Sequence, residues 1–176
     1  MKKVMEEKFS KLENSRLALL ENLKNIPTSK LEASPTIGKW SVSQIFYHLN
    51  RAESFSTIYV SKKRLDVNNL KKTGLNEAFR LAFLQFLFHL PFALKAPVNV
   101  LGDVPDKVDY TAITTEWNET RKKLKDLLVS LPDDMLYKNV FKQPAIGRIN
   151  IFQMLDFMQA HFNRHKKQVE KIVERS

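Results

Sequence analysis

The chain has 176 residues, which is enough for one domain with a buried core, and we expect a single domain over residues 1–176. Its 4 Gly and 7 Pro are too few for a turn-rich β protein, and the absence of cysteine excludes disulfides, Cys-ligated zinc and a cysteine nucleophile. The net charge of +10 is spread along the chain among acidic residues, so we do not expect a nucleic-acid-binding protein.

Four segments carry apolar residues at the three-and-four spacing of an amphipathic helix, and they lie at residues 3–25, 41–65, 111–131 and 150–173. Pro27 follows the first segment and Pro132 follows the third, which marks their ends. The connection at residues 66–110 is long and includes a short predicted helix around residues 75–89. Because a long crossover lets two consecutive helices run parallel, the pattern predicts an all-α, four-helix bundle with a long crossover between helices 2 and 3.

The most apolar stretch, residues 81–101, is interrupted by polar residues and prolines well short of the length that spans a membrane. The N-terminal sequence MKKVMEEKFSKLE has no apolar core of a signal peptide. We therefore expect a cytoplasmic protein that does not insert into membranes. The apolar residues 81–94 are expected to be buried or to form a homodimer interface, and His89 within them is expected to be structural.

Two of the predicted helices have well-determined starts. In WSVSQI, Ser41 is the expected N-cap and Gln44 the partner three residues later, with Trp40 and Ile45 as a hydrophobic staple. In INIFQM, residues 149–154, Asn150 takes the place of the usual Ser or Thr, with Gln153, Ile149 and Met154 in the corresponding positions. Distances along both helices can therefore be measured from a known first residue.

Three of the 4 histidines fall on or beside the predicted apolar faces. At 1.5 Å per residue, His48 lies roughly 10 Å from the start of its helix, and the midpoint of His161 and His165 lies roughly 20 Å from the start of theirs. In a bundle roughly 30 Å long, antiparallel packing would bring the three side chains to one level, whereas parallel packing would separate them. An i,i+4 pair with a third histidine opposite can hold a divalent metal, but such a pair also occurs on ordinary solvated helix faces.

The chain resembles the DinB/YfiT-like superfamily of metalloenzymes, especially its DinB_2-type branch, in the ordered motifs GKWSVSQIFYHLNRAE (38–53), KAPVNVLGDVPDK (95–107) and GRINIFQMLDFMQAHFNRHKKQVEKI (147–172). The resemblance implies a four-helix bundle with metal ligands at His48, His161 and His165, whereas His89 matches no family ligand. Characterised relatives of this kind include metal-dependent transferases of small thiols such as bacillithiol, mycothiol or glutathione, and thiol-dependent isomerases of maleylpyruvate.

Two functional hypotheses follow. In the first, the three histidines hold a divalent ion, Zn or Ni with Mn as a further option, and the protein transfers a low-molecular-weight thiol to an electrophilic small-molecule substrate or hydrolyses a small substrate. In the second, the protein is a non-catalytic metal-binding or dimeric interaction module. No catalytic role is assigned to the nearby polar residues Gln44, Asn50, Glu53, Arg164 and Gln168, and the bulky side chains Phe46, Tyr47, Phe157 and Phe162 either line a pocket or fill the core.

Overall fold

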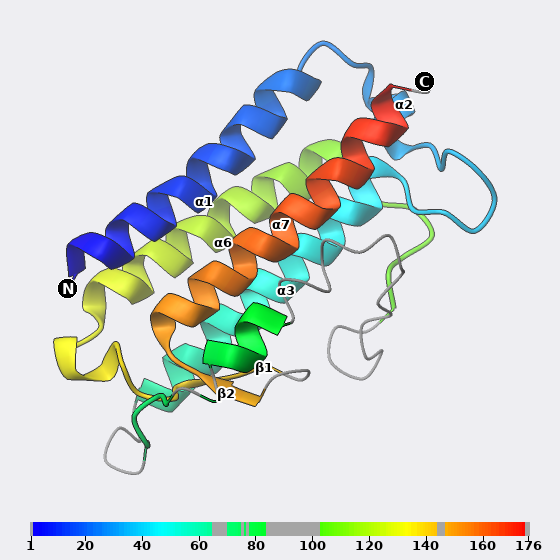
Figure 1. Cartoon of the computed structure of the whole chain (residues 1–176). Helices are drawn as coiled ribbons and strands as arrows, with labels where there is room; N and C mark the ends of the chain where they lie inside the picture. The colour runs from blue at the N-terminus through cyan, green and yellow to red at the C-terminus, as the bar shows by residue number, and fades with distance from the viewer. Residues whose placement is uncertain are drawn as a thin grey trace.

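The structure is a computed structural model of the whole chain and describes residues 2–64, 70–74, 76, 78–83, 103–143 and 147–174. Four long helices, which we call the bundle, lie side by side (Figure 1). They are α1 (Lys2–Leu23), α3 (Val42–Lys63), α6 (Tyr110–Ser130) and α7 (Ile151–Val173). These bounds agree closely with the predicted segments, and the predicted all-α class is confirmed.

The bundle consists of two pairs of helices that run in opposite directions (Figure 1). Helices α1 and α7 run one way, and α3 and α6 run the other, so the long connection from α3 to α6 returns the chain to the end at which α3 began. The most extensive contact is between α3 and α6, followed by that between α1 and α7. Since α3 and α7 are antiparallel neighbours, they have the relative direction that would bring the three histidines to one level.

Short elements close the ends of the bundle. Helix α2 (Thr28–Glu32) follows α1, and the 3-10 turn η2 (Asp133–Met135) follows α6. Strands β1 (Phe141–Gln143) and β2 (Gly147–Ile149), which the sequence analysis did not predict, pair antiparallel just before α7. In the predicted helix around residues 75–89, residues 76 and 78–83 are helical, while His89 and most of the apolar stretch 81–101 lie outside the described residues. No helix in the described part of the chain is both long and apolar enough to cross a membrane.

The two predicted capping boxes are confirmed. At the start of α3, Ser41 Oγ accepts a hydrogen bond of 3.1 Å from the Gln44 backbone N–H, and Gln44 Oε1 accepts one of 2.9 Å from the Ser41 N–H. At the start of α7, Asn150 Oδ1 accepts from the Gln153 N–H at 2.9 Å, and Gln153 Oε1 accepts from the Asn150 N–H at 3.2 Å. Asparagine therefore fills the serine role, because both side chains offer an acceptor oxygen at short reach.

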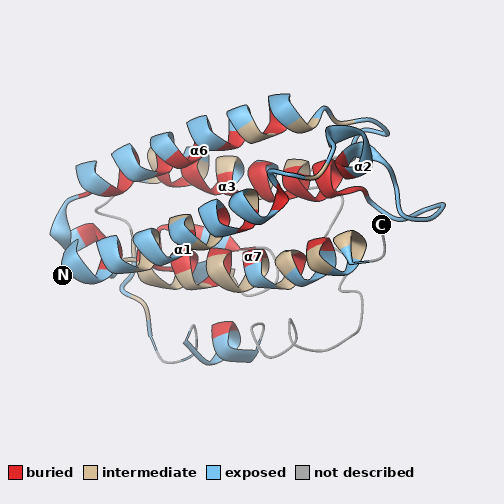
Figure 2. Cartoon of the chain, turned by 90° about the horizontal axis from the view of Figure 1, so that it is seen from above, coloured by how far each residue is buried: buried red, intermediate tan, exposed pale blue. Residues whose placement is uncertain are grey.

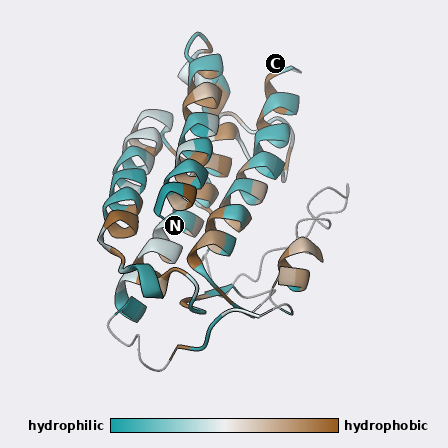
Figure 3. Cartoon of the chain, turned by 60° about the vertical axis from the view of Figure 1, so that its left-hand side comes forward, coloured by the Kyte–Doolittle hydropathy of each residue, from teal (hydrophilic) through white to brown (hydrophobic). Residues whose placement is uncertain are grey.

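The core runs along the axis of the bundle, where the buried faces of the helices meet (Figure 2). Trp117, Leu124 and Phe162 are fully buried there. The hydropathy pattern agrees, because hydrophilic residues cover much of the outer surfaces of the long helices (Figure 3). The helical residues 78–83 differ, since Phe79 and Phe83 are 74% and 55% exposed.

A buried ionic cluster joins α1, α3 and α6. Glu53, which is 3% exposed, accepts hydrogen bonds from Arg121 Nε at 2.6 Å and Nη2 at 2.7 Å, and from Trp117 Nε1 at 2.8 Å. Arg121 also donates to Glu13, which pairs with the buried Arg16. Each buried charge therefore has a partner of opposite sign, which is the condition for keeping charges inside a protein.

Candidate metal centre

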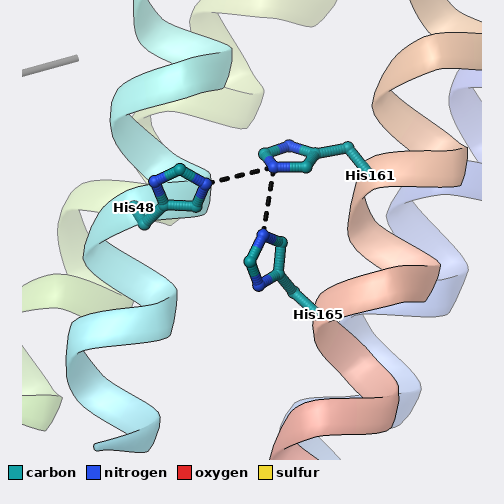
Figure 4. Close-up of side chains that lie close together, drawn as sticks. All are labelled: His48, His161 and His165. Atoms are coloured by element: carbon teal, nitrogen blue, oxygen red, sulfur yellow. Dashed lines mark hydrogen bonds between the residues drawn. The ribbon is translucent and has the colours of Figure 1, made fainter. Parts of the chain in front are cut away.

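The three predicted histidines meet between α3 and α7 (Figure 4). Nε2 of His161 lies 3.1 Å from Nε2 of His48 and 3.1 Å from Nε2 of His165. One nitrogen from each ring lies within 4.8 Å of the other two. The distances along the two predicted helices required α3 and α7 to be antiparallel, and the structure has this arrangement.

All three imidazoles are neutral at pH 7. Burial lowers the pKa of His48 from 6.5 to about 4. The pKa of His165 falls to about 3, first because the ring is buried and then because positive charge on His48 would repel its proton. Burial, followed by repulsion from His165 and His48, holds the pKa of His161 well below 6.5. A neutral imidazole keeps a lone pair on one nitrogen, which is the form that binds metal ions.

Two of the three nitrogen separations, those that involve His161, suit ligands of a single divalent ion. Zinc binds histidine nitrogen at about 2.0–2.1 Å, so two donors in a tetrahedral site lie about 3.3 Å apart. The separations of 3.1 Å from His161 Nε2 to the other two Nε2 atoms are close to that value, and the group as a whole spans no more than 4.8 Å. A group of three neutral nitrogen donors, with His48 and His165 buried and His161 partly buried, is thus compatible with metal binding.

His165 also makes a hydrogen bond on the side of its ring that faces away from the other two histidines. Its Nδ1 lies 2.8 Å from Oε1 of Gln168, one turn further along α7. The positive charge of Arg164 contributes to the lowered pKa of both His161 and His165. These are two of the polar residues near the histidines to which the sequence analysis assigned no role.

The other polar residues of that group lie away from the centre or make different contacts. Gln44 Nε2 donates to the backbone oxygens of Pro105 at 2.7 Å and Asp106 at 3.3 Å, so it ties α3 to the segment before α6. Glu53 belongs to the ionic cluster. Asn50 is buried, and its Oδ1 has no hydrogen-bond partner among the described residues.

Two aromatic rings pack against the histidines. The Phe157 ring stacks on His161 with centroids 5.7 Å apart and planes at 11°, and the Trp40 ring lies 5.1 Å from His48. Phe157 is buried, whereas Trp40 is 39% exposed. From the sequence, Trp40 was expected only to form a hydrophobic staple. Its position just before the N-cap Ser41 also places it near the first turns of α3, which carry His48.

The remaining aromatic residues that the sequence left open are now divided between site and core. Phe46 and Phe162 are fully buried, and their rings pack on Trp117 at 5.1 and 6.3 Å. Tyr47 is partly buried. Of the four, Phe157 alone has a described ring contact with a histidine of the centre.

Comparison with known families agrees with this arrangement. The model of the DinB superfamily matches residues 11–169, which include all three histidines. The chain belongs to the DinB superfamily. The chain is also similar to the uncharacterized protein YuaE of Bacillus subtilis (strain 168), with 23% identity over a 169-residue alignment that covers 92% of this chain and 94% of YuaE. No solved structure matches the chain.

Proposed function

We propose that this DinB-superfamily protein is a metal-dependent enzyme whose divalent ion is held by His48, His161 and His165. One observation carries the proposal: the Nε2 atoms of three neutral, largely buried imidazoles converge from two antiparallel helices. Buried polar groups are costly to place together unless they share a partner, and imidazole nitrogen suits Zn and Ni, with Mn as a weaker fit.

Three neutral ligands leave the charge of a bound ion undiminished, so the ion would stabilise the anionic form of a thiol or of water at neutral pH. The residues of the chain supply position and environment. The rings of Phe157 and Trp40 cover part of His161 and His48, and an apolar cover of this kind strengthens electrostatic interactions beneath it. His161 is only partly buried, so we expect a small molecule to reach the centre from the side of this ring.

The reaction that best fits these features is the transfer of a low-molecular-weight thiol to an electrophile. A carbon–sulfur bond forms, the leaving group departs with its electron pair, and the thiol proton passes to solvent. The resemblance to thiol-transferring relatives supports this choice over hydrolysis of a small substrate. The net charge of +10 also favours approach of an anionic thiol.

The first test is the metal content of protein purified without a polyhistidine tag. We expect near-stoichiometric Zn, Ni or Mn in the wild type and its loss in His48→Ala. The matched control is His89→Ala, which removes the remaining one of the 4 histidines and should keep the metal. A wild-type protein that binds no ion even after incubation with excess metal would refute the proposal.

Thiol transfer is tested separately on metal-loaded protein. Conjugation should require both the thiol and an intact His48, across a panel of electrophiles assayed with glutathione and bacillithiol. Release of product without added thiol would favour the alternative hypothesis, in which the protein hydrolyses a small substrate. If the metal-loaded protein neither binds nor conjugates a thiol, the protein is a metal-binding module without thiol-transfer activity.

A second candidate function is that of a homodimeric interaction module. It is supported by Phe79 and Phe83, which are largely exposed on the helical residues 78–83. Exposed large apolar side chains that lie together commonly mark an interface. Sedimentation of wild type against the Phe79→Ser/Phe83→Ser variant tests it, because a wild-type monomer at high concentration would exclude this dimer.

A further inference from the structure

We propose that Gln168 is a positioning residue: it selects the tautomer of His165 and thereby directs the Nε2 lone pair of that ring toward His161 and His48. The inference deepens the proposed function, on which its consequence for metal binding rests. Its primary test needs no metal.

The geometry assigns the proton. Gln168 Oε1 lies 2.8 Å from His165 Nδ1, a normal hydrogen-bond distance. An amide oxygen can only accept, so Nδ1 carries the hydrogen and donates it. In a neutral imidazole the other nitrogen, Nε2, then carries the lone pair. That Nε2 is the atom 3.1 Å from Nε2 of His161 (Figure 4).

Selection of the tautomer matters because either nitrogen of a neutral histidine can carry the proton, and the hydrogen bond made by one nitrogen decides the state of the other. A proton on His165 Nε2 would block the nitrogen that faces the centre. Outer hydrogen-bond partners that fix a ligand histidine typically change metal affinity 10- to 100-fold when they are removed.

The position of Gln168 suits this role. The residue lies three positions after His165 on α7, so the two side chains occupy neighbouring sites on one helix face. His165 is 7% exposed whereas Gln168 is exposed, so the amide meets the ring at the boundary between the buried centre and solvent. The adjacent Lys167, also exposed on the same turn, has no contact with a histidine ring among the described interactions and provides a matched control.

The test uses long-range ¹H–¹⁵N correlation spectra of histidine-labelled, chelator-treated protein at neutral pH, with His165→Ala to assign the signals. We expect the wild type and Lys167→Leu to carry the His165 proton on Nδ1. Gln168→Glu should keep it there, because a carboxylate also only accepts, whereas Gln168→Leu should shift the population toward Nε2–H. A wild-type proton on Nε2, or an unchanged spectrum in Gln168→Leu, would overturn the inference.

Metal competition with a chromophoric chelator supplies the second readout. Gln168→Leu should weaken metal binding about 10- to 100-fold, while Gln168→Glu and Lys167→Leu should stay close to wild type. If wild-type protein binds no metal, the proposed function fails, but the spectra still decide the role of Gln168. If metal binds and Gln168→Leu binds it as tightly as wild type, the positioning role fails while the metal site stands.

Discussion

His48 and His161 are 113 residues apart in the chain, yet their Nε2 atoms lie 3.1 Å from each other. The contact joins the start of α3 to the middle of α7, and it exists because the two helices run antiparallel (Figure 1). One helical turn rises about 5.4 Å, so sliding either helix by one turn would separate the rings. The centre is therefore sensitive to helix register, and changes far from the histidines can be expected to affect it.

Metal binding should stabilise the folded protein through the three histidines. An ion that binds the folded state alone adds about 2.7 kcal/mol at a free concentration of 100 times its Kd. We expect this gain in wild type, measured as a rise in Tm on addition of Zn²⁺, and its loss in His161→Ala. Asn163→Ala, an exposed change on the same helix, should respond like wild type, and an equal rise in His161→Ala would contradict the site.

The metal-free protein should lose stability on acidification. The pKa values of His48 and His165 in the folded state, about 4 and about 3, lie below the unfolded value of 6.5. The unfolded chain therefore binds more protons below pH 6.5, and the free energy of unfolding falls as the pH drops from 6.5 toward 4. Each group contributes a slope of up to about 1.4 kcal/mol per pH unit.

Urea unfolding at a series of pH values measures this slope. In His48→Leu the slope over the same range should be smaller, because one buried base has been removed. A variant with an unchanged slope would mean that other groups control the acid sensitivity.

The ionic cluster should tolerate loss of one partner poorly. Glu53→Gln removes the closer of the two carboxylates that neutralise Arg121 and leaves only Glu13 at 3.3 Å, and breaking a buried pair in this way costs about 3–5 kcal/mol. Asp134, which is 63% exposed and pairs with Lys138, is the control, because Asp134→Asn should cost less than about 1 kcal/mol. Denaturant unfolding of both variants compares them directly, and similar small losses would show that water reaches Arg121.

The capping boxes should each contribute measurable stability. Ser41→Ala and Asn150→Ala remove the side-chain acceptors of α3 and α7, and each should lower the free energy of unfolding by about 1 kcal/mol. Asn150→Ser keeps an acceptor oxygen and should stay near wild type. Thermal or urea unfolding distinguishes the cases, and a destabilised Asn150→Ser would show that the amide of Asn150 has a role beyond capping.

Several features could be predicted from the sequence because their causes are local. The four helices follow from apolar periodicity, and the starts of α3 and α7 follow from capping partners only three residues apart. The three histidines could be proposed together because their distances from those starts are known once the helices are known. The family resemblance pointed to the same residues.

Only the tertiary structure decided what depends on neighbours distant in the chain. Whether α3 and α7 are antiparallel was left open by helix spacing, since either direction satisfies the same local pattern. Glu53 was assigned no catalytic role from the sequence, and its burial depends on Arg121, 68 residues later. The same holds for the aromatic residues. Phe157 stacks on a histidine of the centre, whereas Phe46 and Phe162 pack on Trp117 in the core. Which of these contacts a ring makes depends on the side chains that surround it in the fold and not on its own segment of the sequence.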